Sequence, residues 1–591
     1  MTNDKTSNTV FTLILTIAAH HRSGGILLST SPFTLKSYAK WKLKQENIDN
    51  ININAHVFPN ATCAEEITEY ILASNADVVG LSMYIWNYSV LRESAMMVKK
   101  QRPDIKILFG GPQVSPIAAE IINNNWFVDI IPYLTVPGEN IFFNVLKAVS
   151  GRQDLNRVNN IYYREGTQII KTLPANEEVD LEQSPSPLLD GTIDLNGDNK
   201  YQIVLESSRG CFMECAYCFW SGETRHVRYF PLERVLAEID KVYSNPQVTH
   251  VIFADSDVLM NRERTNTLID KIKTYGSRIS TFFEVDAIRI TESNRDIVEK
   301  ISSLDRSMIK FAIQSANPET LRIMKRPFAF EKYAEKAALV RSWIPDVAIC
   351  VEIIASLPGD TLSTFIDTID ASLSLEPAHI HTNYPLYLLP GTDYFINKSA
   401  LGITHTGDPN YTIIETATFP KKDIITALHL AFFTEILTFY HPILAKTLYR
   451  ICRKDQTERR VDRLARWMTA IENCLGLLTY IEDVVVKITE NVDSLNEIKG
   501  DFLHAACSPN QSAQMYQAIL DLEGLSEEAL DEFSDGIKVY KQISNRPPVK
   551  GKSPYENLED LFLIEVEANS GQIGLQTARK FVPRFVFDGR V

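Results

Sequence analysis

The chain has few cysteines, no excess of basic residues and no long apolar run, and each absence narrows its possible functions. Eight cysteines in 591 residues are too few for a disulfide framework. The formal net charge of −14 argues against general binding of a nucleic-acid backbone, which a basic surface would favour. The sequence therefore predicts no nucleic-acid partner.

The first apolar segment is too short to span a membrane. Val10 to Ala19 is about ten residues, whereas a helix that crosses a bilayer needs roughly 20. The segment also lacks the charged start and the small-residue cleavage site of a signal peptide. We interpret it as a buried first strand, and we expect a cytoplasmic protein without membrane association.

Three of the eight cysteines stand close together. Cys211, Cys215 and Cys218 belong to the segment E-S-S-R-G-C-F-M-E-C-A-Y-C-F-W, which begins at Glu206. Three thiolates at spacings of four and three residues can hold an iron–sulfur cluster and leave one iron without a protein ligand. Structural zinc is the main alternative, but such a site normally has four protein ligands, and no second C-x-x-C follows. A disulfide pair would conflict with the expected reducing compartment.

The spacing C-x-x-x-C-x-x-C resembles the signature of the radical S-adenosylmethionine (SAM) superfamily. Arg-Gly precedes the first cysteine and an aromatic residue precedes the third, as in that signature. The resemblance implies that Cys211, Cys215 and Cys218 bind a 4Fe–4S cluster and that SAM binds its open iron. It also implies an electron donor of the flavodoxin or ferredoxin type.

Residues 1–150 alternate between short β-rich runs and amphipathic helical patterns, and the length of the chain favours about three domains. This alternation predicts a Rossmann-like α/β domain with a parallel sheet. The expected strands are Val10–Thr16, Ile51–Val57, Asp77–Ser82, Lys106–Phe109 and Val128–Ile131. The expected helices are Pro32–Lys44, Ala64–Ser74, Val90–Gln101, Pro116–Asn124 and Glu139–Val149.

Three loops of this domain share a glycine-rich or aromatic character and follow predicted strands. G-L-S-M-Y-I-W-N begins at Gly80, G-G-P-Q-V-S at Gly110, and P-G-E at Pro137. Together they resemble the cobalamin-binding domain that precedes the radical SAM domain in cobalamin-dependent radical SAM enzymes. The resemblance implies cobalamin contacts from Ser82, Tyr84, Trp86, Asn87, Gly110, Gly111, Gln113, Val114, Pro137, Gly138 and Glu139. The alternative for Tyr84, Trp86 and Asn87 is a packed aromatic loop with one capping polar residue.

The histidine motif D-x-H-x-x-G of other cobalamin proteins is absent. His56 is followed by Val-Phe-Pro-Asn instead. We therefore expect no histidine ligand to cobalt from this domain.

Residues 151–200 are expected to be a linker with a hairpin at Asn160–Ile170, and residues 201–422 a partial barrel of six strand–helix units. In such barrels the functional residues lie at the strand ends. The expected strands are Tyr201–Leu205, His250–Phe253, Ser280–Val285, Met308–Ala312, Ala348–Ile354 and His379–Tyr387. Leu232–Tyr243 and Asn266–Tyr275 are two of the intervening helices.

Polar or glycine-rich residues follow these strands and resemble SAM-binding segments of the superfamily. I-Q-S-A-N-P-E, from Ile313, is similar to I-Q-S-G-x-x-E, and L-P-G-D-T, from Leu357, is similar to G-x-P-G-E-T. A-D-S-D replaces the usual G-G-E, so its two carboxylates are assigned by position only. The implied SAM-binding residues are Phe219, Asp255, Asp257, Glu284, Gln314, Ser315, Pro358 and Gly359. For Asp255, Glu284 and Gln314 the alternative is a side chain that caps the next helix.

In residues 423–591 long helical patterns replace the alternation of strands and helices, and no group of residues there predicts catalysis. Thr426–Leu448 and Arg459–Cys474 are expected helices, and Leu561–Val566 is a final apolar stretch. We expect a mostly helical domain that covers the barrel mouth and shapes a substrate pocket. Cys452, Cys474 and Cys507 lack metal-ligand spacing and are expected to be core thiols.

Three functions are compatible with these features. The first is methyl transfer from SAM, through cobalamin, to an unactivated carbon or phosphorus of a peptide or natural product. The second keeps both cofactors but performs a radical rearrangement, cyclisation or epimerisation. The third is a non-catalytic cluster- or cobalamin-binding redox sensor. The sequence identifies neither the substrate nor a further catalytic residue.

Overall fold

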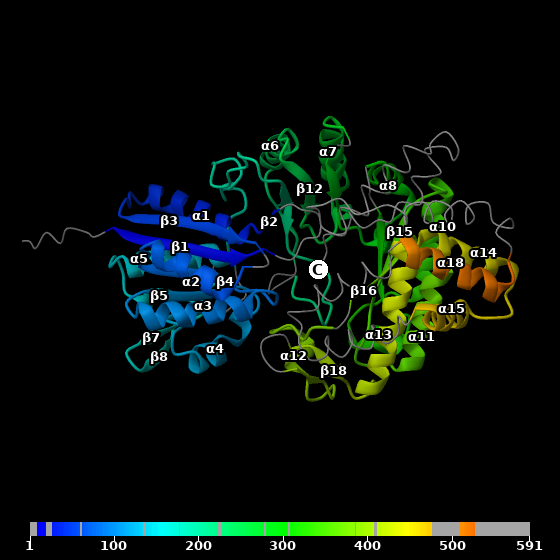
Figure 1. Ribbon diagram of the computed structural model, residues 1–591. Coiled ribbons are helices and arrows are strands. Elements are labelled where there is room, and N and C mark those ends of the chain that lie inside the picture. The colour runs from blue at the N-terminus through cyan, green and yellow to red at the C-terminus, as the bar shows by residue number, and fades with distance from the viewer. Residues whose placement is uncertain are drawn as a thin grey trace, which may run out of the picture.

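The computed structural model describes most of the first 475 residues and one later helix. The described ranges are 9–18, 26–59, 62–133, 137–176, 178–220, 226–276, 279–304, 308–383, 386–406, 411–475 and 509–525. Figure 1 shows the N-terminal sheet on the left, the barrel strands in the middle, and the last described helices on the far right. The predicted stretch Leu561–Val566 and the thiol of Cys507 lie outside these ranges.

The N-terminal sheet has seven strands in the order β3-β1-β4-β5-β6-β7-β8. Its first five strands are parallel, as predicted, and the hairpin β7–β8 is antiparallel. The strands are β1 (Val10–Ile17), β3 (Ile51–Phe58), β4 (Val78–Ser82), β5 (Lys106–Gly110), β6 (Ile130–Pro132), β7 (Ile161–Glu165) and β8 (Gln168–Lys171). The sequence assigned the hairpin to a linker, whereas here it extends the first sheet.

Helices cover both faces of this sheet. Ile14 packs among buried residues of α1 and α5, whereas its neighbours Leu13 and Leu15 pack with α2, α3 and α4. This alternation follows from the two-residue period of a strand. The helices are α1 (Ser31–Gln45), α2 (Ala64–Ala73), α3 (Tyr88–Gln101), η1 (Ser115–Ile117), α4 (Ala118–Asn124), α5 (Gly138–Val149) and η2 (Leu155–Arg157).

The central region contains six parallel barrel strands in two groups, β9–β12–β13 and β14–β15–β16. A seventh strand, β2 (Ile26–Leu28), comes from the N-terminal region and pairs in parallel with β9. The barrel strands are β9 (Tyr201–Leu205), β12 (Val248–Phe253), β13 (Ser280–Phe282), β14 (Ile309–Gln314), β15 (Ile349–Ile354) and β16 (His379–Asn383). The sequence analysis missed β2, which is only three residues long and therefore shows no periodicity.

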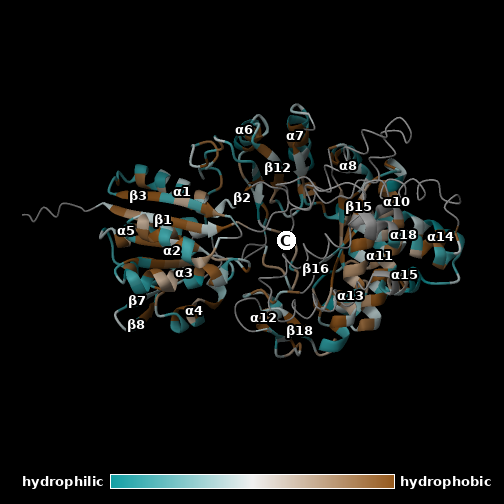
Figure 2. Ribbon diagram, viewed as in Figure 1, coloured by the Kyte–Doolittle hydropathy of each residue, from teal (hydrophilic) through white to brown (hydrophobic). Residues whose placement is uncertain are grey.

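Helices alternate with these strands on the outside of the barrel, and short strands flank it. The helices are α6 (Leu232–Tyr243), η3 (Val258–Met260), α7 (Arg262–Lys273), η4 (Ala287–Arg289), η5 (Glu292–Asn294), α8 (Arg295–Ser302), α9 (Pro318–Ile323), α10 (Phe330–Trp343), α11 (Leu362–Ser374) and α12 (Asp393–Ile396). The short strands are β10 (Ser208–Arg209), β11 (Arg228–Tyr229), β17 (Thr404–His405) and β18 (Ile413–Glu415). Buried hydrophobic residues of the helices and the barrel strands belong to one core cluster, and Figure 2 shows hydrophobic and hydrophilic stretches alternating along the helices.

The expected helix Thr426–Leu448 is interrupted. It consists of α13 (Lys421–Glu435), the π-helix η6 (Ile436–Tyr440) and α14 (Pro442–Lys454). His441 has φ −125° and ψ 62°, which is not helical. Pro442 follows it, and proline both lacks an N–H and disfavours helical geometry in the residue before it.

The remaining described helices form an outer layer. α15 (Arg460–Leu475) packs against α11 on the barrel exterior, and α18 (Pro509–Glu523) packs on α15. Tyr449 donates its hydroxyl to the Pro377 carbonyl oxygen at 3.0 Å, and the Val461 N–H donates to Asp370 of α11 at 3.0 Å. A role of residues 423–591 in covering the barrel mouth stays a prediction. No helix among the described residues is long and apolar enough to cross a membrane.

Candidate functional site

A cavity of about 360 Å³ opens at the carboxyl ends of β4 and β5. Its inner part lies between the sheet and helices α1 and α5, where apolar side chains line it. They are Ile14, Leu35, Leu108, Ile141, Phe142 and Val145. An apolar space beside a parallel sheet, with glycines at its entrance, suits a large ligand that inserts one part of its structure between the sheet and the helices.

Six of the predicted cobalamin residues line this cavity: Ser82, Tyr84, Gly110, Gly111, Gly138 and Glu139. A Cβ atom on Gly110 would meet no heavy atom within 4 Å, so a side chain there would project into open space. Gly111 has φ +105°, and a Cβ atom there would come within 2.4 Å of the Met83 carbonyl oxygen. Only glycine fits this turn without strain.

The other predicted cobalamin residues lie outside the cavity lining. Asn87 accepts a hydrogen bond from the Tyr84 N–H at 2.8 Å and donates to Thr16 Oγ1 at 3.0 Å, which is the capping alternative. Trp86 stacks on Tyr84 with ring centroids 4.5 Å apart and donates to the Ile17 carbonyl oxygen at 3.2 Å. Gln113 and Val114 are buried, and Pro137 precedes the first residue of α5. Their assignment to cobalamin stays a prediction.

The cysteine loop is closed at its base by pairing of β10 with β11. Gly210 follows β10 with φ +102°, and a Cβ atom there would lie 2.3 Å from the His226 carbonyl oxygen. The Met213 N–H donates to Cys211 Sγ, and the Trp220 N–H donates to Cys218 Sγ, both at 3.4 Å. Backbone N–H groups directed at sulfur are one means by which proteins stabilise iron–sulfur clusters.

The three thiols influence one another electrostatically. Burial, together with the neighbouring Cys215 and Cys211, raises the pKa of Cys218 to about 11. Burial likewise raises the pKa of Cys211. The thiolates required for metal binding are therefore disfavoured without a cation and become stable with one. The six described cysteines form no disulfide.

The number of cysteine ligands favours a cluster over a single zinc ion. A structural zinc site normally has four protein ligands, whereas three cysteines can hold a cluster that leaves one iron open. The donor set thus fits a cluster held by three cysteines.

Arg326 is a residue near the cysteines that sequence reasoning missed. Its guanidinium is buried and donates to Cys215 Sγ at 3.5 Å and to the Ala312 carbonyl oxygen at 2.8 Å. The positive charge of Arg326 favours the thiolate form of Cys218. In the sequence, Arg326 lies in the segment M-K-R-P, and this segment gave no indication of a functional role.

The cysteine loop meets the cavity. Arg209, which precedes Gly210, and Phe219, which follows Cys218, both line it. Arg209 forms an ion pair with Glu139 at 2.7 Å and with Glu206 at 3.0 Å. Phe219 was assigned to SAM by sequence, but here it shares the cavity with Gly110 and Gly111.

Asp255 and Asp257 are buried at the end of β12, and their oxygens already have partners. Asp255 accepts hydrogen bonds from the Ser207 N–H at 3.1 Å, from the Ser207 hydroxyl at 2.8 Å and from the Ser208 hydroxyl. Asp257 accepts from the Leu259 N–H at 3.0 Å and pairs with Arg289 at 3.0 Å. Their positions fit orientation of the cysteine loop and capping of η3 as well as contact with SAM.

The remaining SAM assignments follow three neighbouring strands. Glu284 pairs with Lys310 at 2.8 Å. Gln314 is buried, has φ +66°, and its Oε1 has no hydrogen-bond partner among the described residues. Positive φ in a residue other than glycine costs energy and is frequent at ligand sites.

Ser315 donates to Asp360 at 3.2 Å and thereby joins the next strand end. Gly359, after Pro358, has φ +97°, and its N–H donates to Thr418 Oγ1 at 3.0 Å. The structure thus brings these residues to adjacent strand ends, and their contact with SAM stays a prediction.

Comparison with known proteins agrees with this arrangement. Residues 35–141 match the family model of the B12 binding domain, and residues 205–371 match that of the radical SAM superfamily. The chain thus contains a B12 binding domain followed by a radical SAM domain. In this radical SAM protein the first match contains most of the cavity-lining residues, and the second contains the three cysteines.

Two curated relatives of the chain are methyltransferases by name. The chain is 29% identical over 175 residues to 2-(S-pantetheinyl)-carbapenam-3-carboxylate methyltransferase of Streptantibioticus cattleyicolor, and the match covers 28% of the chain. It is 28% identical over 172 residues to the cobalamin-dependent radical SAM methyltransferase TokK of Streptomyces tokunonensis, again over 28% of the chain. Each match spans only 25% of the relative's own length.

The fold of this radical SAM protein also resembles a solved structure over most of its length. The structure is that of the cobalamin-dependent S-adenosylmethionine radical enzyme OxsB with aqua-cobalamin and S-adenosylmethionine bound. The TM-score is 0.55 at 14% identity, and the match covers 90% of the chain and 84% of OxsB. At this identity the similarity concerns the fold.

Proposed function

We propose that the protein is a cobalamin-dependent radical SAM methyltransferase that acts on a carbon or phosphorus centre of a natural product or peptide. The carrying observation is that Arg209 and Phe219, which flank the cysteine loop, also line the cavity of the first sheet. One lining surface therefore joins the cysteine loop to the proposed cobalamin cavity. The printed names of the two curated relatives support methyl transfer as the reaction.

The chain's own residues have separable roles in this proposal. Cys211, Cys215 and Cys218 hold the cluster, and Arg326 supplies positive charge beside Cys215. The apolar slot beneath Gly110 holds the lower part of cobalamin, and Tyr84 lies at its entrance. When bound, the cluster and SAM supply a carbon-centred radical and cobalamin supplies a methyl group.

Burial of the site serves to exclude water and oxygen. Burial raises the pKa of Tyr84, whose hydroxyl contacts Ser31 at the start of α1. Tyr84 therefore stays neutral and offers a flat ring with one hydrogen-bonding group. The substrate and its binding residues are not assigned.

The test is anaerobic turnover of the reconstituted protein with SAM that carries a deuterated methyl group. Extracts of the producing cells supply the substrate. Methyl transfer should then yield S-adenosylhomocysteine, 5′-deoxyadenosine and a product that carries the deuterated methyl group. 5′-Deoxyadenosine without S-adenosylhomocysteine or label would support radical rearrangement instead. A cluster whose electron paramagnetic resonance spectrum does not respond to SAM would support a non-catalytic redox sensor.

Two variants separate the sites. Cys218→Ala should abolish cluster binding, because a cube with a SAM-accessible iron needs all three cysteines. Gly110→Leu should leave the fold intact and weaken cobalamin binding by at least about tenfold, because the added side chain fills the cavity. Unchanged cobalamin affinity of Gly110→Leu would contradict the proposed cobalamin position.

A further inference from the structure

The strands β14, β15 and β16 present an unusual row of polar side chains on one face. The register places Lys310 beside Cys350, Cys350 beside His379, and Glu352 beside His381. The alternate residues Val351, Ile353 and Ile380 belong to the apolar core that includes α11. The polar row therefore lies on the face opposite the barrel helices.

Two histidines of this row converge with a glutamate from another element. Suitable donor atoms of His379, His381 and Glu435 all lie within 4.8 Å of one another. His381 Nδ1 is 3.7 Å from Glu435 Oε1. His379 and Glu435 are 1% and 5% exposed, so the site is enclosed rather than a cluster of surface charges.

Two imidazoles and one carboxylate form a donor set typical of borderline divalent cations such as Zn²⁺ and Fe²⁺. Bonds of about 2.0–2.1 Å would place tetrahedral donor atoms about 3.4 Å apart. Binding therefore has to draw the three side chains slightly together.

The surroundings orient the donors. His379 Nδ1 lies 3.6 Å from Cys350 Sγ, a contact that assigns the ligand role to Nε2. Orientation of a ligating histidine by a contact at its other nitrogen is usual in metal sites. Lys310, the nearby cation of the row, is paired with Glu284 at 2.8 Å and with Glu352 at 2.7 Å. The positive charge of Lys310 is thus neutralised by the carboxylates of Glu284 and Glu352.

The chain is irregular at the third donor, which is a second and independent sign of a site. Glu435 is the last residue of α13, and the π-helix η6 begins at the next residue. Single π-turns within helices are frequent at functional sites. The irregular segment also binds β16 directly, because Thr438 Oγ1 accepts a hydrogen bond from the Ile380 N–H at 2.9 Å.

We propose that His379, His381 and Glu435 form a divalent-cation site that joins the last barrel strand to the helix that follows it. Zn²⁺ is the ion best suited to two neutral imidazoles and one carboxylate, with water in the fourth position. The site is separate from the cysteine loop and does not depend on the proposed methyl transfer. Its role is to hold η6 against the edge of β16.

The test is the zinc content of the tag-free full-length chain, measured by plasma mass spectrometry after dialysis against Zn²⁺. We expect one zinc per chain in a Cys211→Ser, Cys215→Ser, Cys218→Ser background, where the cysteine loop cannot contribute. X-ray absorption at the zinc edge should then show nitrogen and oxygen ligands without sulfur. Zinc should also raise the melting temperature, because it binds the folded chain only.

Matched variants make the result decisive. His381→Ala should weaken zinc binding at least about tenfold and abolish the thermal shift, whereas His405→Ala should change neither. Glu435→Gln keeps the shape of the side chain and should weaken binding as well, which covers the case in which His381→Ala folds poorly. Zinc content and thermal shift that are absent in the parent, or unchanged in His381→Ala and Glu435→Gln, would overturn the proposal.

Discussion

Asp257 shows how burial controls the chemistry of a single side chain. Its carboxyl group is inaccessible to solvent and lies 3.0 Å from Arg289. Burial, together with the charge of Asp286, nevertheless raises the pKa of Asp257 to about 7. The desolvation cost exceeds the attraction of Arg289, whose side chain is 35% exposed and therefore partly screened.

This pKa gives the stability a defined pH dependence. Because the unfolded carboxyl titrates near 3.8, the folded state binds the extra proton between about pH 4 and 7, and stability falls as pH rises through that range. Asp257→Asn removes this dependence. Urea denaturation at pH 5 and pH 8 should show that the variant gains about 2 kcal/mol relative to the parent over this interval.

Asp104→Asn is the control for that experiment. Hydrogen bonding to Arg102 holds the pKa of Asp104 at about 2, so its charge does not change between pH 5 and 8. The stability difference between Asp104→Asn and the parent should therefore be flat. A flat difference for Asp257→Asn as well would show that Asp257 is ionised throughout.

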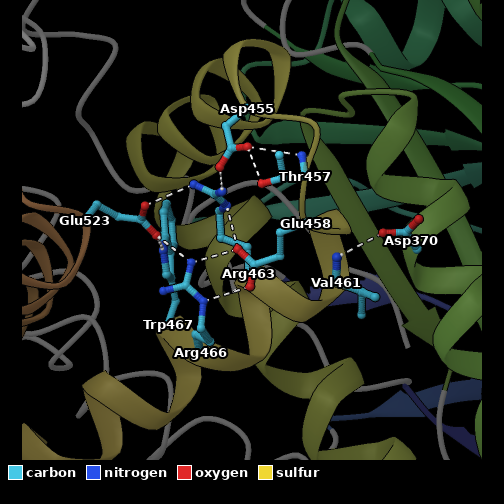
Figure 3. A network of polar contacts seen from close by, with 9 residues as sticks. All are labelled: Asp370, Asp455, Thr457, Glu458, Val461, Arg463, Arg466, Trp467 and Glu523. Carbon is cyan, nitrogen blue, oxygen red and sulfur yellow. Dashed lines mark hydrogen bonds and ion pairs between the residues drawn. The ribbon is translucent and has the colours of Figure 1, made fainter.

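At the scale of elements, α15 and α18 are joined by a network of ion pairs (Figure 3). Arg463, whose side chain is 5% exposed, pairs with Glu523 at 3.0 Å, with Asp455 at 2.5 Å and with Glu458 at 3.2 Å. Trp467 Nε1 donates to the same Glu523 at 2.7 Å. The network connects two helices that lie far apart in the sequence.

Arg463→Ala should destabilise this helix pair by about 3 kcal/mol, because it leaves the carboxylate of Glu523 buried without its main partner. Arg466→Ala is the matched control on the same helix. The Arg466 side chain is 43% exposed, and its loss should cost less than about 1 kcal/mol. Urea denaturation and protease cleavage near residues 509–525 measure both effects. Equal effects of the two variants would contradict a buried network.

At the scale of the whole molecule, Arg209 connects the barrel to the first sheet. It lies in β10, just before the cysteine loop, and pairs with Glu139, the second residue of α5. The Glu139 side chain is 6% exposed. Loss of Arg209 therefore leaves a buried carboxylate beside the cavity, stabilised only by the positive end of its helix.

Arg209→Ala should loosen the contact between the two regions without unfolding either. Hydrogen exchange should rise by about tenfold or more in residues 138–142 and 206–209 and stay unchanged in α11. Arg102→Ala removes an exposed ion pair with Asp104 and should have no such effect. Unchanged exchange in residues 138–142 of Arg209→Ala would show that the ion pair does not couple the regions.

The sequence alone determined the order of the elements and the spacing of the three cysteines that we predict to bind the cluster. In strands such as Ile51–Phe58 the alternation of apolar and polar residues is visible within the strand itself. The spacing of three cysteines that are close in sequence is likewise visible within one short segment. Glycines at strand ends, such as Gly110 and Gly111, indicated a ligand site there, because a ligand that lies close to the backbone leaves no room for a side chain.

The tertiary structure alone decided which side chains face the cavity and which distant residues meet. Asn87 and Val114 turned toward the core, whereas Arg209 came to the cavity through its pairing with Glu139. Arg326 reached Cys215 across 111 residues, and Glu435 reached His381 across the edge of β16. Such contacts depend on how strands and helices pack, and packing brings together residues whose separation along the chain leaves no local pattern.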